Sequence, residues 1–563
     1  MNISFKKLLV ATVSALVVSF QISAQDGMKL LDAEKYSKAK EAFEGGVKTA
    51  PTPENYFNLG NFNLLNPQVD LKAAEDAFTK GAAIDPKNFL NRIGMGSVKL
   101  ASKDRAGAKV IFDEVLKGTK NKNSEIMVRI AEAYTMFEET NDPAEALRLL
   151  DLAAENKKFV PTEEYYLTKG KIFYRKNDGG AAMSEYEKAL PFNKNTAKIR
   201  SLMGQVWVQG KNFQKAFDNF QGAIAADPTF APTYRQLGNL YVTYKKYALA
   251  AENFKIYNKL ADTDDSAKLR YAKLAFSSQD YESSLGTLNE LKDRVKDPIV
   301  SRLIGMAQIE KGPATSVEGI ANIKKFLAEA AAERHLGVDY GYIGRGLAKI
   351  VDEPNKKMND SLAIMNMEKA IAMSDTSYNY LADIATVYSK AKNYAAAAKT
   401  YQKIIDASKK PTVTDFFNLG NQFSAGKDWT NAKKTWEKVA ELSPKYAIAY
   451  YMTGGATRNL DTTATKASSI PMYQKFVELM DAPDAKPTDA QKKQMATSLS
   501  YMASYAGNTN DFEKAKALYT RVVALDPTNK YAADALTKLN GGMMAPPVTS
   551  PTTTTATTVI PKK

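Results

Sequence analysis

The sequence predicts an all-α solenoid, in which helical hairpins pack on their neighbours to build one elongated core. The first observation is a fixed period: small residues stand 34 positions apart at Gly170, Gly204, Gly238 and Ala272. The second is a large apolar residue 16 positions after each of them, as Phe254 follows Gly238. A period of roughly 20–50 residues is typical of repeat architectures.

The order of residues within one period predicts two packed helices. Tyr234, Leu237, Gly238 and Tyr241 fall at i, i+3, i+4 and i+7, and therefore line one face of a helix. A small residue on this face lets a second helix approach closely, and the large residue of that second helix fills the remaining space. Prolines such as the one in Asp227-Pro228 end the second helix, because proline cannot continue it. Each hairpin keeps an apolar face that only a neighbour can cover.

This pattern resembles the tetratricopeptide repeat, whose period is also 34 residues. The segments around Tyr234, Phe416, Leu381 and Leu499 repeat its order of small and large residues. The resemblance implies an α-α superhelix of about 13–14 hairpins. We expect one large anchor in the second helix of each hairpin, and the candidates are Phe43, Phe78, Phe112, Leu150, Tyr186, Phe220, Phe254, Leu288, Ile323, Met367, Tyr401, Trp436, Tyr473 and Tyr519.

The repeats predict five segments. Residues 1–24 are expected to be a signal peptide, 25–293 an N-terminal array, and 294–376 a divergent connection of helical repeats. Residues 377–540 are expected to be a C-terminal array with a capping helix. Residues 541–563 are rich in Thr and Pro and are expected to be a disordered tail.

The first 24 residues have the order of a secretory signal peptide. Lys6 and Lys7 precede an apolar run over residues 8–20, and a small-residue cleavage site ends at Ala24. The run is shorter than the ~20 residues that cross a bilayer as a helix. We therefore expect a mature chain without a transmembrane span. The absence of cysteine favours a bacterial periplasm, with release to the exterior as the alternative.

The sequence offers little material for catalysis. It contains no cysteine and one histidine, His335. Thiol nucleophiles are therefore excluded, and a metal site built from histidine and cysteine is nearly excluded. The run from Gly341 to Gly346 superficially resembles a phosphate-binding loop, but its glycines have the wrong order and no strand precedes them. We expect no catalytic residue, no cofactor and no metal ion.

The formal net charge is +15, but the basic excess is spread thinly over the later half of the chain. Nucleic-acid binding requires clustered cations, so it is not expected. The charge supports at most a preference for acidic partners or peripheral association with an anionic envelope surface.

The resemblance also implies that partners bind on the concave face, which the first helix of each hairpin lines. Residues just after the small position, and three before it, lie four apart and share that face. The expected partner-binding residues are Phe57, Asn61, Lys171, Gln205, Arg235, Asn239, Phe417 and Asn421. Alternating amide, cationic and aromatic groups suit an extended peptide. The alternative is that these are ordinary solvated helix residues.

The leading hypothesis is a non-enzymatic protein-interaction scaffold of the periplasm or cell envelope. Its partners would be proteins or extended peptides. One alternative is a holdase-like chaperone for exported chains. Another is a wall- or glycan-associated protein that uses the Thr/Pro-rich tail.

Overall fold

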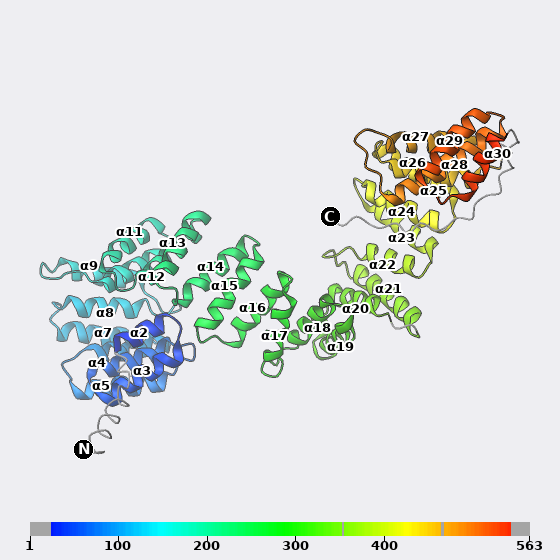
Figure 1. The fold of residues 1–563 in the computed structure, drawn as a ribbon. Helices are drawn as coiled ribbons and strands as arrows, with labels where there is room; N and C mark the ends of the chain where they lie inside the picture. Colours follow the sequence, from blue (N-terminus) through cyan, green and yellow to red (C-terminus); the bar gives the residue numbers. More distant parts are fainter. Residues whose placement is uncertain (1–23, 352–353, 463–466, 542–563) are drawn as a thin grey trace, which may run out of the picture. The chain divides into compact units, whose positions relative to one another are not determined.

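The computed structural model describes residues 24–351, 354–462 and 467–541. The predicted signal peptide and tail therefore lie outside the described residues, apart from Ala24 and Gly541. Within those residues the regular structure is helical, without strands, and consecutive helices pair into antiparallel hairpins (Figure 1). The predicted all-α solenoid is confirmed.

The chain divides into two compact units, unit 1 up to Ala307 and unit 2 from Gln308 onwards. The helices before the division are α2 (Ala24–Asp32), α3 (Tyr36–Thr49), α4 (Pro53–Leu65), α5 (Leu71–Ile84), α6 (Leu90–Ala101), α7 (Arg105–Gly118), α8 (Ser124–Tyr134), α9 (Pro143–Glu155), α10 (Glu163–Arg175), α11 (Gly179–Ala189), α12 (Thr196–Gln209), α13 (Phe213–Ala226), α14 (Ala231–Thr243), α15 (Tyr247–Leu260), α16 (Asp265–Ser277) and α17 (Tyr281–Leu291). Helix α18 (Ile299–Lys311) crosses the division.

The helices of unit 2 after α18 are α19 (Pro313–Glu329), α20 (Gly337–Lys349), α21 (Lys356–Ala372), α22 (Tyr380–Lys390), α23 (Tyr394–Ala407), α24 (Val413–Ala425), α25 (Trp429–Leu442), α26 (Ala447–Leu460), α27 (Ile470–Met480), α28 (Asp489–Asn508), α29 (Phe512–Leu525) and α30 (Lys530–Asn540). Short 3-10 turns cover Leu190–Phe192, Ala332–Arg334 and Ala467–Ser469. Helix α30 has no second helix after it in the described chain, and it covers the last hairpin through Ala532 and Ala535.

The core is a series of local clusters, each centred on the anchor of a second helix. Every predicted anchor lies on the second helix of a hairpin, from Phe43 on α3 to Tyr519 on α29. All of them are buried except Tyr401, which is half-buried. Burial of such a side chain contributes roughly 1.5–3 kcal/mol relative to exposure, so the anchors supply much of the packing energy.

The turn inside a hairpin follows a recurrent scheme. One residue adopts positive φ, as Asn177 and Lys211 do, and the next residue caps the second helix. That cap is Asp178 in one hairpin and Asn212 in the next, and each side chain accepts a hydrogen bond from a backbone N–H of the first helical turn. The cap satisfies a donor that the helix leaves unpaired.

Residues 294–376 fit the 34-residue period poorly because their second helices are longer. Both α19 and α21 have 17 residues, whereas most second helices in unit 1 have 11–14. The hairpin α20–α21 nevertheless pairs like the others. The boundaries 293/294 and 376/377 remain predictions.

The glycine run from Gly341 to Gly346 lies inside α20 and is not a loop. A β-carbon at Gly344 would lie 2.7 Å from the carbonyl oxygen of Ala363 and 2.6 Å from a side-chain carbon of Met367. Gly344 therefore allows α20 and α21 to approach closely.

Among the helices that the structure describes, none is long and apolar enough to span a bilayer.

Candidate protein-binding surface

Three consecutive first helices of unit 1 bring four of the eight predicted partner-binding residues into one series. Helix α10 carries Lys171, α12 carries Gln205, and α14 carries Arg235 and Asn239. Lys198 lies about two turns before Gln205 on α12. We call these five residues the cationic surface.

The cationic surface is contacted by the chain's own first turn, which joins α2 to α3. Both carboxylate oxygens of Asp32 accept from the Lys198 ammonium at 2.7 Å. The Glu34 carboxylate lies 2.5 Å from Arg235 through Oε1 and accepts from the Tyr257 hydroxyl at 2.6 Å through Oε2. The turn therefore places two carboxylates on two cations of the surface.

Backbone contacts and one small side chain complete the docking of this turn. The backbone N–H of Asp262 donates to the carbonyl of Glu34 at 2.9 Å. The Asp262 carboxylate accepts from the backbone N–H of Ser37 at 2.6 Å. Between the two acids, Ala33 is buried against Ala197 and Phe230.

These contacts show that unit 1 curves back on itself. Five hairpins, α4–α5 to α12–α13, separate the first hairpin from α14–α15. Packed helix axes lie about 8–10 Å apart, so a straight stack of five hairpins would span roughly 50 Å. The contact between Glu34 and Arg235 therefore requires strong curvature, and it involves Lys198 and Arg235 near the starts of α12 and α14.

The Glu34–Arg235 pair is partly shielded from water. The side chain of Glu34 is 15% exposed and that of Arg235 is 34% exposed. Burial disfavours the charged guanidinium, but the neighbouring Glu34 outweighs it and raises the pKa of Arg235. Burial, together with the hydrogen bond to Glu34, raises the pKa of Tyr257, so its hydroxyl keeps the proton that it donates.

The surface retains unused hydrogen-bonding capacity beside this pair. The Nε of Arg235 and the Oδ1 of Asn239 are buried without a hydrogen-bond partner. A buried polar atom without a partner costs roughly 1–3 kcal/mol.

Lys171 extends the cationic surface onto α10. The protein atoms around its ammonium, and then the charge of Lys198, lower the pKa of Lys171. The side chain is nevertheless exposed. Water therefore still reaches it, and we expect it to be charged at neutral pH.

The remaining predicted residues lie elsewhere. Phe57 is half-buried, with its ring centre 6.0 Å from that of the anchor Phe78. Asn61 is buried, and its Oδ1 has no hydrogen-bond partner. Phe417 packs edge-on against Trp436 at 5.4 Å. Asn421 is half-buried on α24 of unit 2. The two phenylalanines therefore contribute to the cores of their own hairpins.

Sequence reasoning missed Asp32, Glu34, Lys198 and Tyr257. The contacts of this group join residues 166 to 223 positions apart. No periodic pattern encodes such a contact. The one available clue was a pair of acids in the first turn.

Unit 2 also has a charged cluster on its first helices, but the charged groups of this cluster pair with one another. The Arg345 guanidinium on α20 makes two hydrogen bonds to Glu310 of α18, at 2.8 and 3.3 Å. It also lies 3.5 Å from Asp383 of α22 and 4.2 Å from the ring centre of Tyr378. This cluster links successive first helices.

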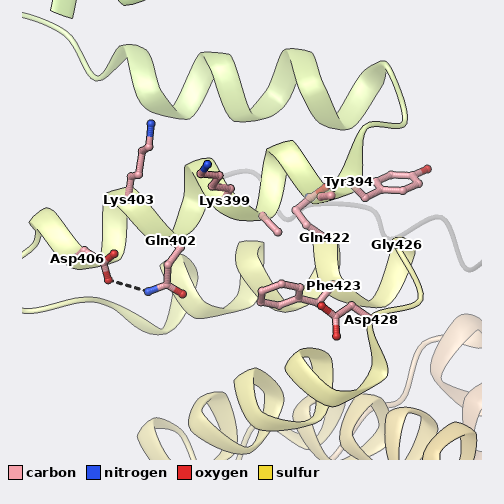
Figure 2. Close-up of a pocket in the computed structure, with 11 residues that line it drawn as sticks. Tyr394, Lys399, Gln402, Lys403, Asp406, Gln422, Phe423, Gly426 and Asp428 are labelled. Atoms are coloured by element: carbon pink, nitrogen blue, oxygen red, sulfur yellow. Dashed lines mark hydrogen bonds between the residues drawn. The ribbon is translucent and has the colours of Figure 1, made fainter.

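An open cavity of about 490 Å³ lies between α23 and the end of α24 in unit 2. Figure 2 shows Gln402 donating to Asp406 on α23, with Phe423 and Asp428 on the neighbouring segment. The Oε1 of Gln422 is buried there without a hydrogen-bond partner.

Comparison with known proteins agrees with this architecture. A tetratricopeptide-repeat family model matches residues 502–529, which cover the end of α28 and all of α29. This match and the fold together support the class of tetratricopeptide-repeat proteins.

Among curated proteins, the chain is 28% identical over 91 residues to the BBSome complex member BBS4 of Bos taurus, and 22% identical over 137 residues to tetratricopeptide repeat protein 21A of Mus musculus. The matches cover 16% and 23% of this chain, but only 18% and 10% of those proteins.

Two solved structures are also similar. One is the C-terminal part of a TPR repeat-containing protein from Cytophaga hutchinsonii, with 25% identity, coverage of 47% of this chain and 98% of that chain, and a TM-score of 0.39. The other is a protective antigen of uropathogenic Escherichia coli with an SLR fold, with 15% identity, coverage of 91% and 99%, and a TM-score of 0.33.

Proposed function

We propose that this chain is a non-catalytic scaffold that binds acidic, extended segments of partner proteins on the cationic surface of unit 1. The observation that carries the proposal is the series of cations Lys171, Lys198 and Arg235 on consecutive first helices. Lys198 and Arg235 each already bind a carboxylate of the chain itself. Amide groups at Gln205 and Asn239 accompany these cations and can pair with a peptide backbone.

We propose further that the protein works in the periplasm after removal of residues 1–24. Support comes from Lys6 and Lys7 before the apolar run, from the small residues that end at Ala24, and from the absence of cysteine. The mature protein would then begin at Gln25.

Site-specific photocrosslinking in the native cell tests both proposals. A photoreactive amino acid replaces Gln205 on the cationic surface, or Ile256, an exposed residue of α15, as the control. The periplasmic fraction is then analysed for crosslinked products and for a mature N-terminus at Gln25. We expect a few stoichiometric products at position 205 that are not formed at position 256.

The same experiment with Arg235→Glu should remove those products, because the reversed charge repels an acidic segment. Lys255→Glu on α15 makes the same change of charge on an exposed residue outside the surface and should leave them intact. Products at position 205 that persist in Arg235→Glu would refute the proposed surface. Many weak products would instead indicate the holdase alternative.

A further inference from the structure

We propose that the turn between α2 and α3 is an internal ligand of the cationic surface, and that an acidic partner segment must displace it. The partner class is a segment with two carboxylates separated by one small residue. This inference rests on the proposed function, since it names what the same surface recognises and what competes for it.

The contacts define the chemistry of the ligand. Lys198 holds the first carboxylate, and Arg235 with Tyr257 holds the second. The residue between the two acids, Ala33, is 7% exposed. A larger side chain has no room there, so the surface selects acid–small–acid.

The docked turn is distinct from the packing of the first hairpin. That hairpin stacks on α4 through Phe43, whose ring centre lies 5.8 Å from that of Phe62. The bonds described above between the first hairpin and α12, α14 and α15 come from residues 32–37 alone. Displacing the turn therefore leaves the anchor of the hairpin in place.

The sequence of this turn differs from the other hairpin turns at the position with positive φ. Elsewhere a residue such as Lys211 or Gln279 has positive φ, and Asn212 or Asp280 then caps the second helix. Here Glu34, the one acid among the described residues with positive φ, holds this position, and Lys35 stands at the cap without a side-chain hydrogen bond to the helix, as Lys246 does at the start of α15. The acid has thus left the capping position, where it would stabilise α3, and stands where it reaches Arg235.

The interaction is suited to reversible competition. The Asp32–Lys198 pair is 26% exposed on both sides, so water screens it in part. When a surface is open only part of the time, its apparent affinity for a partner is the intrinsic affinity multiplied by the fraction of time that it is open. If the turn is docked nine-tenths of the time, releasing it should tighten binding about tenfold.

Fluorescence anisotropy with the mature full-length chain tests this directly. The probe is a labelled peptide that copies residues 29–37, and a copy with Asp32→Asn and Glu34→Gln is the control peptide. We expect the protein variant Asp32→Asn/Glu34→Gln to bind the probe about tenfold more tightly than the wild type. Lys198→Gln/Arg235→Gln should lose binding, and the control peptide should not bind. Equal affinity of the wild type and the released variant overturns the proposal.

A reversible lock gives an independent measurement. Ala33 and Ala197 pack in one buried cluster, and the chain contains no cysteine, so Ala33→Cys/Ala197→Cys introduces a single disulfide. The oxidised variant should lose probe binding, and dithiothreitol should restore it. Full binding in the oxidised state contradicts the proposal.

The two proposals fail in different ways. If crosslinking at Gln205 still depends on Arg235, but release of the turn does not tighten binding, only the internal-ligand inference fails. If crosslinking at Gln205 is independent of Arg235, the proposed binding surface itself is wrong.

Discussion

At the scale of residues, each hairpin depends on matched volumes where its helices cross. A β-carbon at Gly204 would overlap with the ring of Phe220, so glycine is required beneath this anchor. In a later hairpin the same two positions hold Ala272 and Leu288, both fully buried. Alanine, which is larger than glycine, is thus paired with leucine, which is smaller than phenylalanine.

This pairing predicts compensation between two substitutions. Gly204→Ala should destabilise the hairpin by about 1–3 kcal/mol, because the added methyl group overpacks the crossing. Phe220→Leu alone should also destabilise it, because it leaves a void. The double variant should cost less than the sum, because the two positions share one space. Amide hydrogen exchange in α12 and α13 measures the local free energy of opening.

Gly286→Ala is the matched control. No atom lies within 4 Å of the added methyl group on α17. We expect a gain of up to about 1 kcal/mol, since alanine is the better helix former. Destabilisation of similar size by both alanines would show that the Phe220 ring is not the cause.

At the scale of elements, most second helices begin with an acidic or amide residue at the cap. Asp280 accepts from the backbone N–H of Ser283 at 3.1 Å at the start of α17. Hydrogen bonds from the hydroxyl and the backbone N–H of Ser283 lower the pKa of Asp280. The ionised cap therefore stabilises the helix above the ordinary carboxyl pKa of about 3.9, and this contribution is lost as pH falls through the lower folded value.

Asp280→Ala should destabilise α17 by about 1 kcal/mol at neutral pH. The difference from wild type should shrink as the pH falls below about 4, where Asp280 takes up a proton in the folded state too. Asp280→Asn keeps the acceptor without the charge and should lose no cap contribution in acid. Hydrogen exchange of α17, compared between variants at each pH, measures these effects. A constant difference between Asp280→Ala and wild type at every pH would argue against an ionic contribution.

At the scale of the whole molecule, stability is a sum of local terms with one long-range contact in unit 1. Neighbouring helices make the contacts within each unit, as expected for a solenoid. The docking of the α2–α3 turn against α14 and α15 adds a contact that neighbour packing does not supply.

Phe43→Ala therefore should raise amide exchange in α2–α5 and also around Arg235 and Tyr257, because loss of the anchor loosens the docked turn. Exchange in α22–α29 should not change. Phe476→Ala, which removes an equally buried ring in unit 2, should raise exchange in α26–α29 only. Mass spectrometry of exchanged peptides measures both. No response around Arg235 in Phe43→Ala would show that the turn does not couple the two regions.

The sequence by itself determined the hairpins, because their information lies within one period. The anchor Phe220 was predicted from its distance to Gly204, and the ends of second helices were predicted from prolines such as Pro228. The glycine run in α20 could be excluded as a phosphate loop, but the role of Gly344 in the approach of α21 needed the structure.

Only the tertiary structure decided what Arg235 contacts. Each hairpin adds a small rotation to the stack, and the sum over five hairpins returns the chain to Glu34. That sum depends on the packing angle at every interface, and no pattern within 34 residues records it. The sequence thus selected Arg235 as a candidate binding residue of a first helix, and the accumulated curvature of unit 1 supplied its partner within the chain.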